Sequence, residues 1–159
     1  LYLPVPVLIA LIGNHLKYHF YNTLVERTSW AKDTYEGGGH KVTIDVHGTR
    51  NEIVGQQRNC SANSCDGHTA RIYLYGDGND VFGKQKADSS KTFNLRINND
   101  DNVVDYLQDG NASHTANIIL DGAYGTDLDL IQHAGSAQSY SLTQNCQTSG
   151  GCSITVTQQ

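Results

Sequence analysis

Acidic and histidine side chains are the residues of this sequence that could bind a metal ion or transfer a proton. The stretches GDGND, Gly76–Asp80, and NNDDN, Asn98–Asn102, are similar to Asp/Gly calcium loops. Calcium-binding β-rolls repeat about every nine residues with a Gly-Gly-x-Gly-x-Asp pattern, which this sequence lacks. We therefore interpret both stretches as solvated turns and predict no metal site.

The seven histidines form no catalytic pattern. No Ser/His/Asp spacing, HExxH motif or catalytic carboxylate pair stands out, and carboxylates recur wherever turns recur. We therefore predict that the protein has no catalytic residues, is not an enzyme and uses no cofactor. His40 and His68 share one position of the repeat described below, so one hypothesis is that they stack on adjacent rungs, where their repulsion when protonated would weaken the fold at low pH. We favour the alternative that they are satisfied histidines at the surface or the rim.

The four cysteines form two close pairs, Cys60 with Cys65 in CSANSC and Cys146 with Cys152 in CQTSGGC. Zinc sites favour tighter pairs with matching His or Cys partners, and these two pairs lie far apart in the chain. We predict two local disulfides, with free or metal-bound thiols as the alternative. Disulfides indicate an exported protein.

An internal repeat must position all of these residues. HTARIYLYGDGNDVFGKQ, His68–Gln85, aligns without a gap on HKVTIDVHGTRNEIVGQQ, His40–Gln57. His, Gly, Asn, Gly and Gln coincide at repeat positions 1, 9, 12, 16 and 18, and apolar residues coincide at positions 5, 7 and 14. Further copies run over Lys91–Gln108, Thr115–Gln132 and Gln138–Gln158, the last with three extra residues in its turn. Residues 40–159 thus hold five repeats, which start at 40, 68, 91, 115 and 138.

Each repeat is typical of two short strands with alternating apolar residues, joined by a Gly/Asp/Asn turn. One such unit cannot bury its apolar row alone, whereas stacked units pair strand with strand at about 4.8 Å and bury a continuous core. We therefore predict an all-β fold, a β-solenoid of stacked strand-turn-strand rungs with two facing parallel sheets. Residues at one repeat position then lie directly above one another.

Side-chain amides recur at two inward-facing positions of the repeat. An isolated buried amide is costly, but stacked Asn or Gln side chains can hydrogen-bond to the copies above and below. A slip of register would leave several buried amides without partners, so the amides would fix the register. The predicted amide ladder comprises Asn51, Asn79 and Asn102 at position 12, and Gln57, Gln85, Gln108, Gln132 and Gln158 at position 18.

The rung has a polar first residue, alternating apolar positions, a Gly turn, an Asn and a terminal Gln. It resembles the curlin repeat of the major and minor subunits of curli, the bacterial functional amyloid, over Lys41–Gln159, about three quarters of the chain. Curlin units usually carry Ser at position 1 and Gln at position 7. Here position 1 is His40, His68, Lys91, Thr115 and Gln138, and only Gln144 keeps the position-7 glutamine.

The resemblance implies a structural subunit of an extracellular curli-like amyloid fibre, for a biofilm matrix or for surface adhesion. Its partners would be copies of itself, together with a nucleator and a secretion machinery. The net charge of −5, without any basic run, argues against a nucleic-acid partner. The opening LYLPVPVLIALIG is interrupted by Pro4 and Pro6 and falls short of the about 20 apolar residues that span a bilayer, so we expect no membrane span.

Residues 1–39 form an apolar N-terminal segment that departs from the repeat. VPVLIALIGNHLKYHFYN, Val5–Asn22, can be aligned on the same frame as a degenerate first rung, followed by an excursion loop around Trp30. The segment is apolar on both faces, so we expect it to pack against a neighbouring subunit. A short core helix around residues 18–27 and a remnant of a signal sequence are the alternatives.

The last rung ends in SITVTQQ, which is rich in β-formers, uncharged and without a cap. Natural solenoids protect their terminal strands with caps or charge, so we predict that this rung stacks head to tail on the first rung of the next subunit. The predicted assembly interface comprises Val7, Ile9, Leu11, Leu142, Ile154 and Val156.

The alternative function is that of a monomeric secreted β-solenoid that acts as a binding module, such as an ice-binding protein or an adhesin. Ice binding favours a flat Thr-x-Thr face on successive rungs. Thr43, Thr155 and Thr157 do not extend through the middle rungs, which favours the fibre.

Overall fold

The computed structural model describes residues 7–12, 15–21, 29–37, 39–58 and 66–159, with side chains from residue 39 onward. Every regular element in this part of the chain is a β-strand. The strands are β1 (Val7–Ile12), β2 (His15–Tyr21), β3 (Ser29–Gly37), β4 (His40–Gly48), β5 (Glu52–Arg58), β6 (Thr69–Tyr75), β7 (Asp80–Gln85), β8 (Lys91–Ile97), β9 (Val103–Asp109), β10 (His114–Gly122), β11 (Thr126–His133), β12 (Gln138–Cys146) and β13 (Cys152–Gln158).

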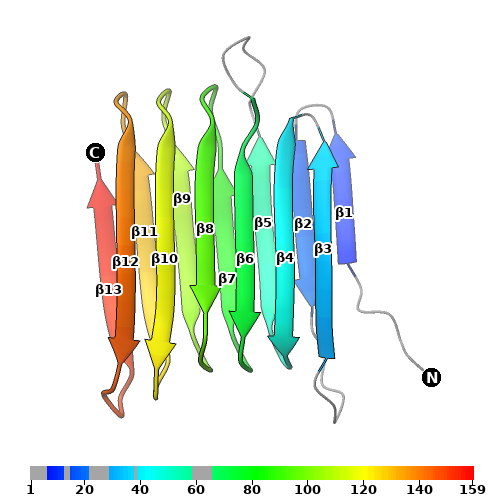
Figure 1. Cartoon of the computed structure of the whole chain (residues 1–159). Coiled ribbons are helices and arrows are strands. Elements are labelled where there is room, and N and C mark those ends of the chain that lie inside the picture. Colours follow the sequence, from blue (N-terminus) through cyan, green and yellow to red (C-terminus); the bar gives the residue numbers. More distant parts are fainter. Residues whose placement is uncertain (1–6, 13–14, 22–28, 38, 59–65) are drawn as a thin grey trace, which may run out of the picture.

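Two sheets face each other along the whole molecule (Figure 1). One sheet has seven strands in the order β1-β2-β5-β7-β9-β11-β13, and the other has six in the order β12-β10-β8-β6-β4-β3. Five rungs, β4–β5 to β12–β13, each give one strand to each sheet, and neighbouring rungs pair in parallel. The predicted β-solenoid of two facing parallel sheets is therefore confirmed.

The core is a strip of alternating residues buried between the two sheets. Because strand side chains alternate between faces, every second residue of a rung points inward, where apolar residues of successive rungs stack. The fully or almost fully buried core residues include Val42, Ile44, Val46, Ile72, Leu74, Leu95, Ile97, Ile118 and Leu120 in the six-stranded sheet, and Ile53, Val81, Val104, Leu128 and Leu130 in the seven-stranded sheet.

The fourth rung begins one residue earlier than the sequence predicted. His114, not Thr115, pairs with Lys91 and Gln138, which places Ala116, Ile118 and Leu120 in the core. The ungapped alignment matched position 12 onward correctly but missed one extra residue in the turn of this rung. A shift of one residue exchanges the two faces of a strand, so Ile119, expected inside, lies 39% exposed.

The N-terminal segment does not form the predicted degenerate first rung. A rung would give one strand to each sheet, but β1 and β2 pair with each other antiparallel in the same sheet, and β2 pairs antiparallel with β5. β3, in the predicted excursion loop, pairs antiparallel with β4. The two-residue link GN between β1 and β2 is a hairpin signal that the alignment overlooked. The alternative of a short core helix is also wrong for residues 18–21, which lie in β2; residues 22–28 lie outside the described residues.

These three strands cover the first rung, and we call them the N-terminal cap. β2 lies on β5 in one sheet and β3 lies on β4 in the other, while β1 extends the seven-stranded sheet one strand further (Figure 1). Solenoids usually protect terminal strands in some such way. At the opposite end of the described chain, β12 and β13 are the edge strands.

The turn glycines are set by the stacking itself. At Gly48 and Gly76, both at repeat position 9, an added Cβ would lie 2.0 Å and 2.3 Å from the backbone carbonyl oxygen of the following rung. Only glycine permits such a close approach of backbone to backbone.

One large side chain in the core, that of Tyr106, fills space left by a glycine on the neighbouring rung. The Tyr106 ring stacks on Phe93 of the facing sheet with the ring centroids 3.6 Å apart, and Tyr106 pairs with Gly83. A Cβ at Gly83 would lie 1.8 Å from the Tyr106 ring. Gly83 is therefore needed for volume rather than for its backbone conformation.

We predict that Gly83→Ala destabilises the fold by about 1–3 kcal/mol, because the Tyr106 ring must move out of a packed core. The free energy of unfolding from urea denaturation measures the loss. The matched control is Gly135→Ala, since nothing lies within 4 Å of a Cβ there. Equal stability of the two variants would show that the core has room at Gly83.

Candidate functional site: the polar ladders and the C-terminal edge

The five glutamines at position 18 form one continuous buried ladder. Each Nε2 donates to the Oε1 of the glutamine in the following rung, from Gln57 to Gln85, Gln85 to Gln108, Gln108 to Gln132 and Gln132 to Gln158, over 2.7–2.8 Å. Each Nε2 also donates to the backbone carbonyl of the second residue of its own rung, at Lys41, Thr69, Thr92, Thr115 and Ser139. Because a carbonyl can only accept, this bond orients each amide and points the donors of the ladder towards the C-terminal edge.

The asparagines at position 12 form a second ladder of opposite direction. Asn79 Nδ2 donates to Asn51 Oδ1 at 3.0 Å, and Asn102 Nδ2 donates to Asn79 Oδ1 at 2.8 Å. Each Oδ1 also accepts from the backbone N–H at position 12 of the next rung, the last being Thr126 N–H to Asn102 Oδ1 at 2.8 Å. The ladder ends there, because Thr126 and then Cys152 replace the asparagine.

Repeat position 1 forms a buried column of mostly basic residues, of which the sequence alignment assigned all but the fourth member correctly. The corrected column is His40, His68, Lys91, His114 and Gln138, and the first four are 0–1% exposed. The His40 and His68 rings stack 4.9 Å apart. The backbone N–H groups of His68 and Lys91 donate to Nδ1 of His40 and His68 respectively. The missed signal was the extra turn residue that hides His114.

Lys91 is fully buried but fully satisfied. Its Nζ donates to the carbonyl oxygens of Ser89, Gly110 and Ala112 at 2.7–2.9 Å, which uses all three ammonium protons. The ammonium thereby joins the links before and after its rung. Burial nevertheless lowers the Lys91 pKa to about 8.

Burial also favours the neutral forms of His68 and His114 in this column. The pKa of His68 is lowered to about 4, chiefly by desolvation, with smaller contributions from His40 and Lys91. The His68 ring is held at Nε2 by the Arg58 carbonyl at 3.0 Å. Desolvation lowers the His114 pKa as well.

The acidic turns hold the backbone of neighbouring rungs. Asp77 Oδ1 accepts from the Thr49 N–H at 2.6 Å, and Asp100 Oδ1 accepts from the Asp77 N–H at 2.8 Å. One carboxylate of GDGND, Asp77, and one of NNDDN, Asp100, thus accept backbone hydrogen bonds along the stack. Within residues 39–58 and 66–159, no group of three or more His, Cys, Asp or Glu side chains could hold a metal ion.

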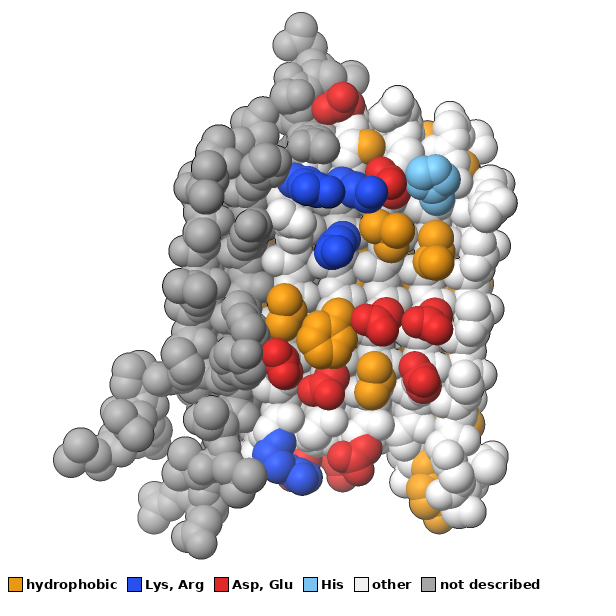
Figure 2. Space-filling model, turned by 180° about the vertical axis from the view of Figure 1, so that it is seen from behind, with side chains coloured by type: hydrophobic (Ala, Val, Ile, Leu, Met, Phe, Trp, Pro, Cys, Tyr) orange, Lys and Arg blue, Asp and Glu red, His pale blue; other side chains and the backbone are white. Residues whose placement is uncertain are grey.

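The outer faces of the two sheets differ in charge. The seven-stranded sheet carries acidic, apolar and some Lys and Arg side chains (Figure 2), with Glu52, Asp80, Asp105, Asp127 and Asp129 on its outward positions. Burial raises the pKa of Asp80 and Asp105, and so do the neighbouring carboxylates, Glu52 for the former and Asp129 and Asp127 for the latter. On the six-stranded sheet, Arg71 and Arg96 lie among Tyr and Asn side chains, with Arg96 over the Tyr75 ring.

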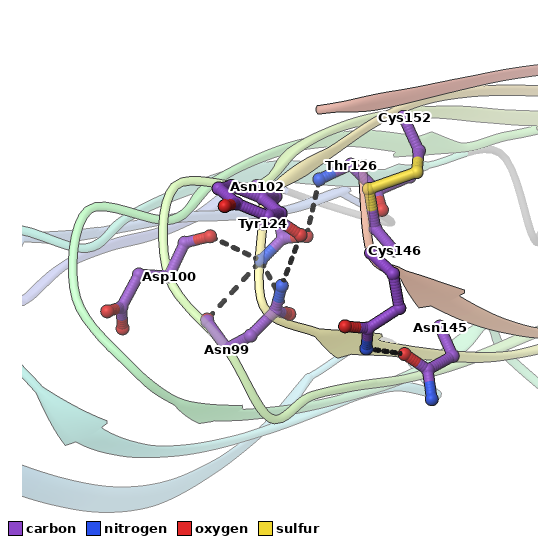
Figure 3. The surroundings of a disulfide bond; sticks show 9 residues. Asn99, Asp100, Asn102, Tyr124, Thr126, Asn145, Cys146 and Cys152 are labelled. Carbon is purple, nitrogen blue, oxygen red and sulfur yellow. Dashed lines mark hydrogen bonds between the residues drawn. A yellow bond between two sulfur atoms is a disulfide. The ribbon is translucent and has the colours of Figure 1, made fainter. Parts of the chain in front are cut away.

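The predicted Cys146–Cys152 disulfide is present. It joins the end of β12 to the start of β13 and lies beside the end of the asparagine ladder at Thr126 (Figure 3). Cys146 is fully buried. The predicted Cys60–Cys65 pair lies outside the described residues.

The C-terminal edge, formed by β12 and β13, is incompletely satisfied. Tyr140, Leu142, Ile154 and Val156 pack against the core but are only partly buried. Gln158 Nε2 has no further glutamine to donate to, and Gln138 Oε1 is buried without a hydrogen-bond partner. Of the predicted interface residues, Leu142, Ile154 and Val156 therefore share this edge, whereas Val7, Ile9 and Leu11 lie on β1 at the opposite end.

Comparisons of the chain with protein-family models, with curated proteins and with solved structures found no match. In the part of the chain covered by the structure, no helix is long and apolar enough to cross a membrane.

We predict that Gln108→Leu destabilises the fold by about 3 kcal/mol, because it leaves the Gln85 donor, the Gln132 acceptor and the Thr92 carbonyl short of a buried bond. Urea denaturation measures the difference. Asn94→Ala, which removes an exposed 2.8 Å amide bond to Asn117, is the control and should cost about 0.5 kcal/mol or less. An equal loss of unfolding free energy in the two variants would contradict the prediction that the buried ladder stabilises the fold more than an exposed amide bond does.

We predict that stability falls as the pH is lowered from 6.5 to about 4, because the unfolded chain protonates His68 in that range and the folded chain does not. The full contribution is present above pH 6.5, and its loss amounts to about 3 kcal/mol for this residue. Free energies of unfolding across this range provide the test.

The control for this pH dependence is His68→Gln. Gln138 already occupies the same column, so the substitution keeps a neutral polar side chain there. The variant should lose the His68 part of the slope. An unchanged slope would assign the acid sensitivity to other groups.

Proposed function

We propose that the protein is the structural subunit of an extracellular, curli-like amyloid fibre that grows by head-to-tail stacking of subunits. The observation that carries this proposal is the C-terminal edge, where β12 and β13, the edge strands of the two sheets, expose unpaired backbone groups beside a partly buried apolar row. Such an edge is a template for pairing with another chain. A second copy is the partner that would continue both the strand ladder and the core.

The chemistry of the edge favours a polymer over chance aggregation. Natural edges are blunted by charge, proline or bulges, whereas β12 and β13 carry no charged residue. The internal disulfide suits an oxidising, extracellular setting. A fibre on a cell surface or in a biofilm matrix, with a nucleator and secretion machinery as further partners, is the role that the curlin-like repeat suggests.

The alternative, a monomeric binding solenoid, is supported by one surface feature. On the six-stranded sheet, Thr69, Thr92, Thr115 and Ser139 form an aligned outer column. The next outward column holds Thr43, Arg71, Asn94, Asn117 and Ser141, so no flat double row of threonines results. This composition disfavours ice binding and leaves an adhesin-like module as the rival.

We expect purified protein to form fibres in a concentration-dependent manner, with a diffraction spacing of about 4.8 Å along the fibre. Negative-stain microscopy and fibre diffraction test this expectation. A protein that stays monomeric at high concentration would contradict the fibre and favour the binding module.

Thr155→Pro should lower the rate of fibre elongation at least about tenfold without unfolding the subunit. Cys152 N–H donates back to Gly125, so by alternation the Thr155 N–H points out of the edge, where proline removes a donor only from the junction. Thr155→Val keeps the N–H and serves as the control. Elongation of the proline variant at the rate of the valine variant would contradict growth through β13.

A further inference from the structure

The glutamine ladder is open at both of its ends, and the two open ends are complementary. At the C-terminal edge, Gln158 Nε2 keeps a proton for a further acceptor, since its only donated bond runs to Ser139 O. At the other end, Gln57 Oε1 is buried and has no hydrogen-bond partner. A buried acceptor without a partner destabilises the structure that contains it.

The N-terminal cap is what leaves Gln57 in this condition. β2 lies over β5 with Leu16 as the Cα partner of Gln57, at the register position where each following rung carries a glutamine. Strands β2 and β3 of the cap pair antiparallel with β5 and β4 of the first rung, whereas neighbouring rungs pair with one another in parallel. It therefore protects the strand edges of the first rung but does not continue its ladder.

The last rung matches the first rung in length and in register. β12 and β4 both have nine residues, and β13 and β5 both have seven. Stacked in the register of the solenoid, Gln158 of one copy lies against Gln57 of the next, and Gln138, whose Oε1 is buried without a partner, lies against His40. Strand pairing lost from the cap would be replaced in both sheets.

Stacking onto the intact cap gives a poorer junction. β1 extends the seven-stranded sheet one strand beyond β3. A β13 strand that pairs with β1 would leave β12 about two strand spacings from β3, so only one sheet would continue. The sequence of β1, VLIALI, also offers no side-chain acceptor to Gln158.

We propose that the N-terminal cap is displaced during assembly, and that the surface beneath it, the outer edges of β4 and β5, receives the last rung of a second copy in parallel register. The Gln158 amide then donates to Gln57 Oε1, which closes the ladder across the junction. This inference rests on the proposed fibre and identifies the surface through which the fibre grows. β1–β3 thereby protect the monomer and are exchanged for the incoming strands.

A cysteine pair across the predicted junction tests the register. In direct stacking, Thr157 of one copy lies next to Gln56 of the following copy, about 4.8 Å away, within reach of a disulfide. Within one chain the two residues lie on the first and last rungs, so a Gln56→Cys/Thr157→Cys link must join two subunits. We expect oxidised fibres of this variant to yield covalent oligomers on non-reducing gels.

The control pair is Lys84→Cys/Thr157→Cys. Lys84 pairs with Gln56 one rung further from the junction, about 9.6 Å from Thr157 of the neighbouring copy and beyond disulfide reach. It should give no oligomers. Fibres that cross-link neither pair would overturn the direct stacking of β13 on β5.

A disulfide between the cap and the first rung tests displacement in the full-length chain. Thr34 and Thr43 are Cα partners on β3 and β4, so an oxidised Thr34→Cys/Thr43→Cys variant holds the cap in place. We expect its elongation rate to fall at least about tenfold. The matched control, Asn94→Cys/Asn117→Cys, joins two internal rungs at a solvent-exposed pair and should elongate like the unmodified protein.

The outcomes separate this inference from the proposed function. Unmodified protein that forms no fibres contradicts the fibre itself. Normal fibre growth by the cap-locked variant overturns cap displacement and leaves the fibre standing. Loss of growth in the cap-locked variant alone, together with junction cross-links through Gln56→Cys, supports displacement.

Discussion

Parallel, in-register stacking is the constraint on which the rest of this structure depends. Once rungs superimpose residue by residue, a polar side chain at an inward position faces its own counterparts and must find hydrogen bonds among them. The glutamine column meets this condition because an amide both donates and accepts, and because a backbone carbonyl of each rung sets its orientation. The apolar core alone would permit a shift of two residues, because such a shift keeps the same side chains facing inward. The ladder opposes this shift, because the buried amides would lose their hydrogen-bond partners.

The rungs keep the same shape although the residue type varies at several repeat positions, because neighbouring residues compensate for the changes. Position 1 holds His, His, Lys, His and Gln, yet each of the first three is held by a backbone carbonyl or N–H group close to it. In the core, Tyr106 is accommodated by Gly83 below it and by Phe93 across from it. Volume and hydrogen-bond capacity are therefore conserved over neighbouring rungs, while the residue types at single positions vary.

The solenoid could be predicted from the sequence because its signal is repeated five times. Spaced Asn and Gln residues, turn glycines and alternating apolar residues all supported one frame, and the glutamine contacts follow from that frame alone.

The predicted start of the fourth rung at Thr115 was wrong because one extra turn residue shifts a strand without disturbing the residues after the turn. The cap was misassigned because its strands have the same period as a rung, and period cannot distinguish a hairpin within one sheet from an arch between two sheets. Only the GN link pointed to the hairpin. Packing partners such as Gly83 and Tyr106 depend on three-dimensional neighbours and leave no pattern in the chain.

The two amide ladders differ at the C-terminal edge, and the difference has a physical reason. The glutamine ladder continues to the last rung and ends with an unused donor, whereas the asparagine ladder stops at Asn102 and is followed by Thr126 and Cys152. An asparagine turn is held by bonds to adjacent rungs, so it would be weakest on the rung that has a neighbour on one side only. The Cys146–Cys152 disulfide closes a loop with a sequence separation of 6 and stabilises it by about 2 kcal/mol, without help from any neighbour. The last rung can therefore keep the shape of a rung although it has a neighbouring rung on one side only. An edge that is ordered in advance loses less conformational freedom on pairing, which favours the proposed addition of a second copy at this edge.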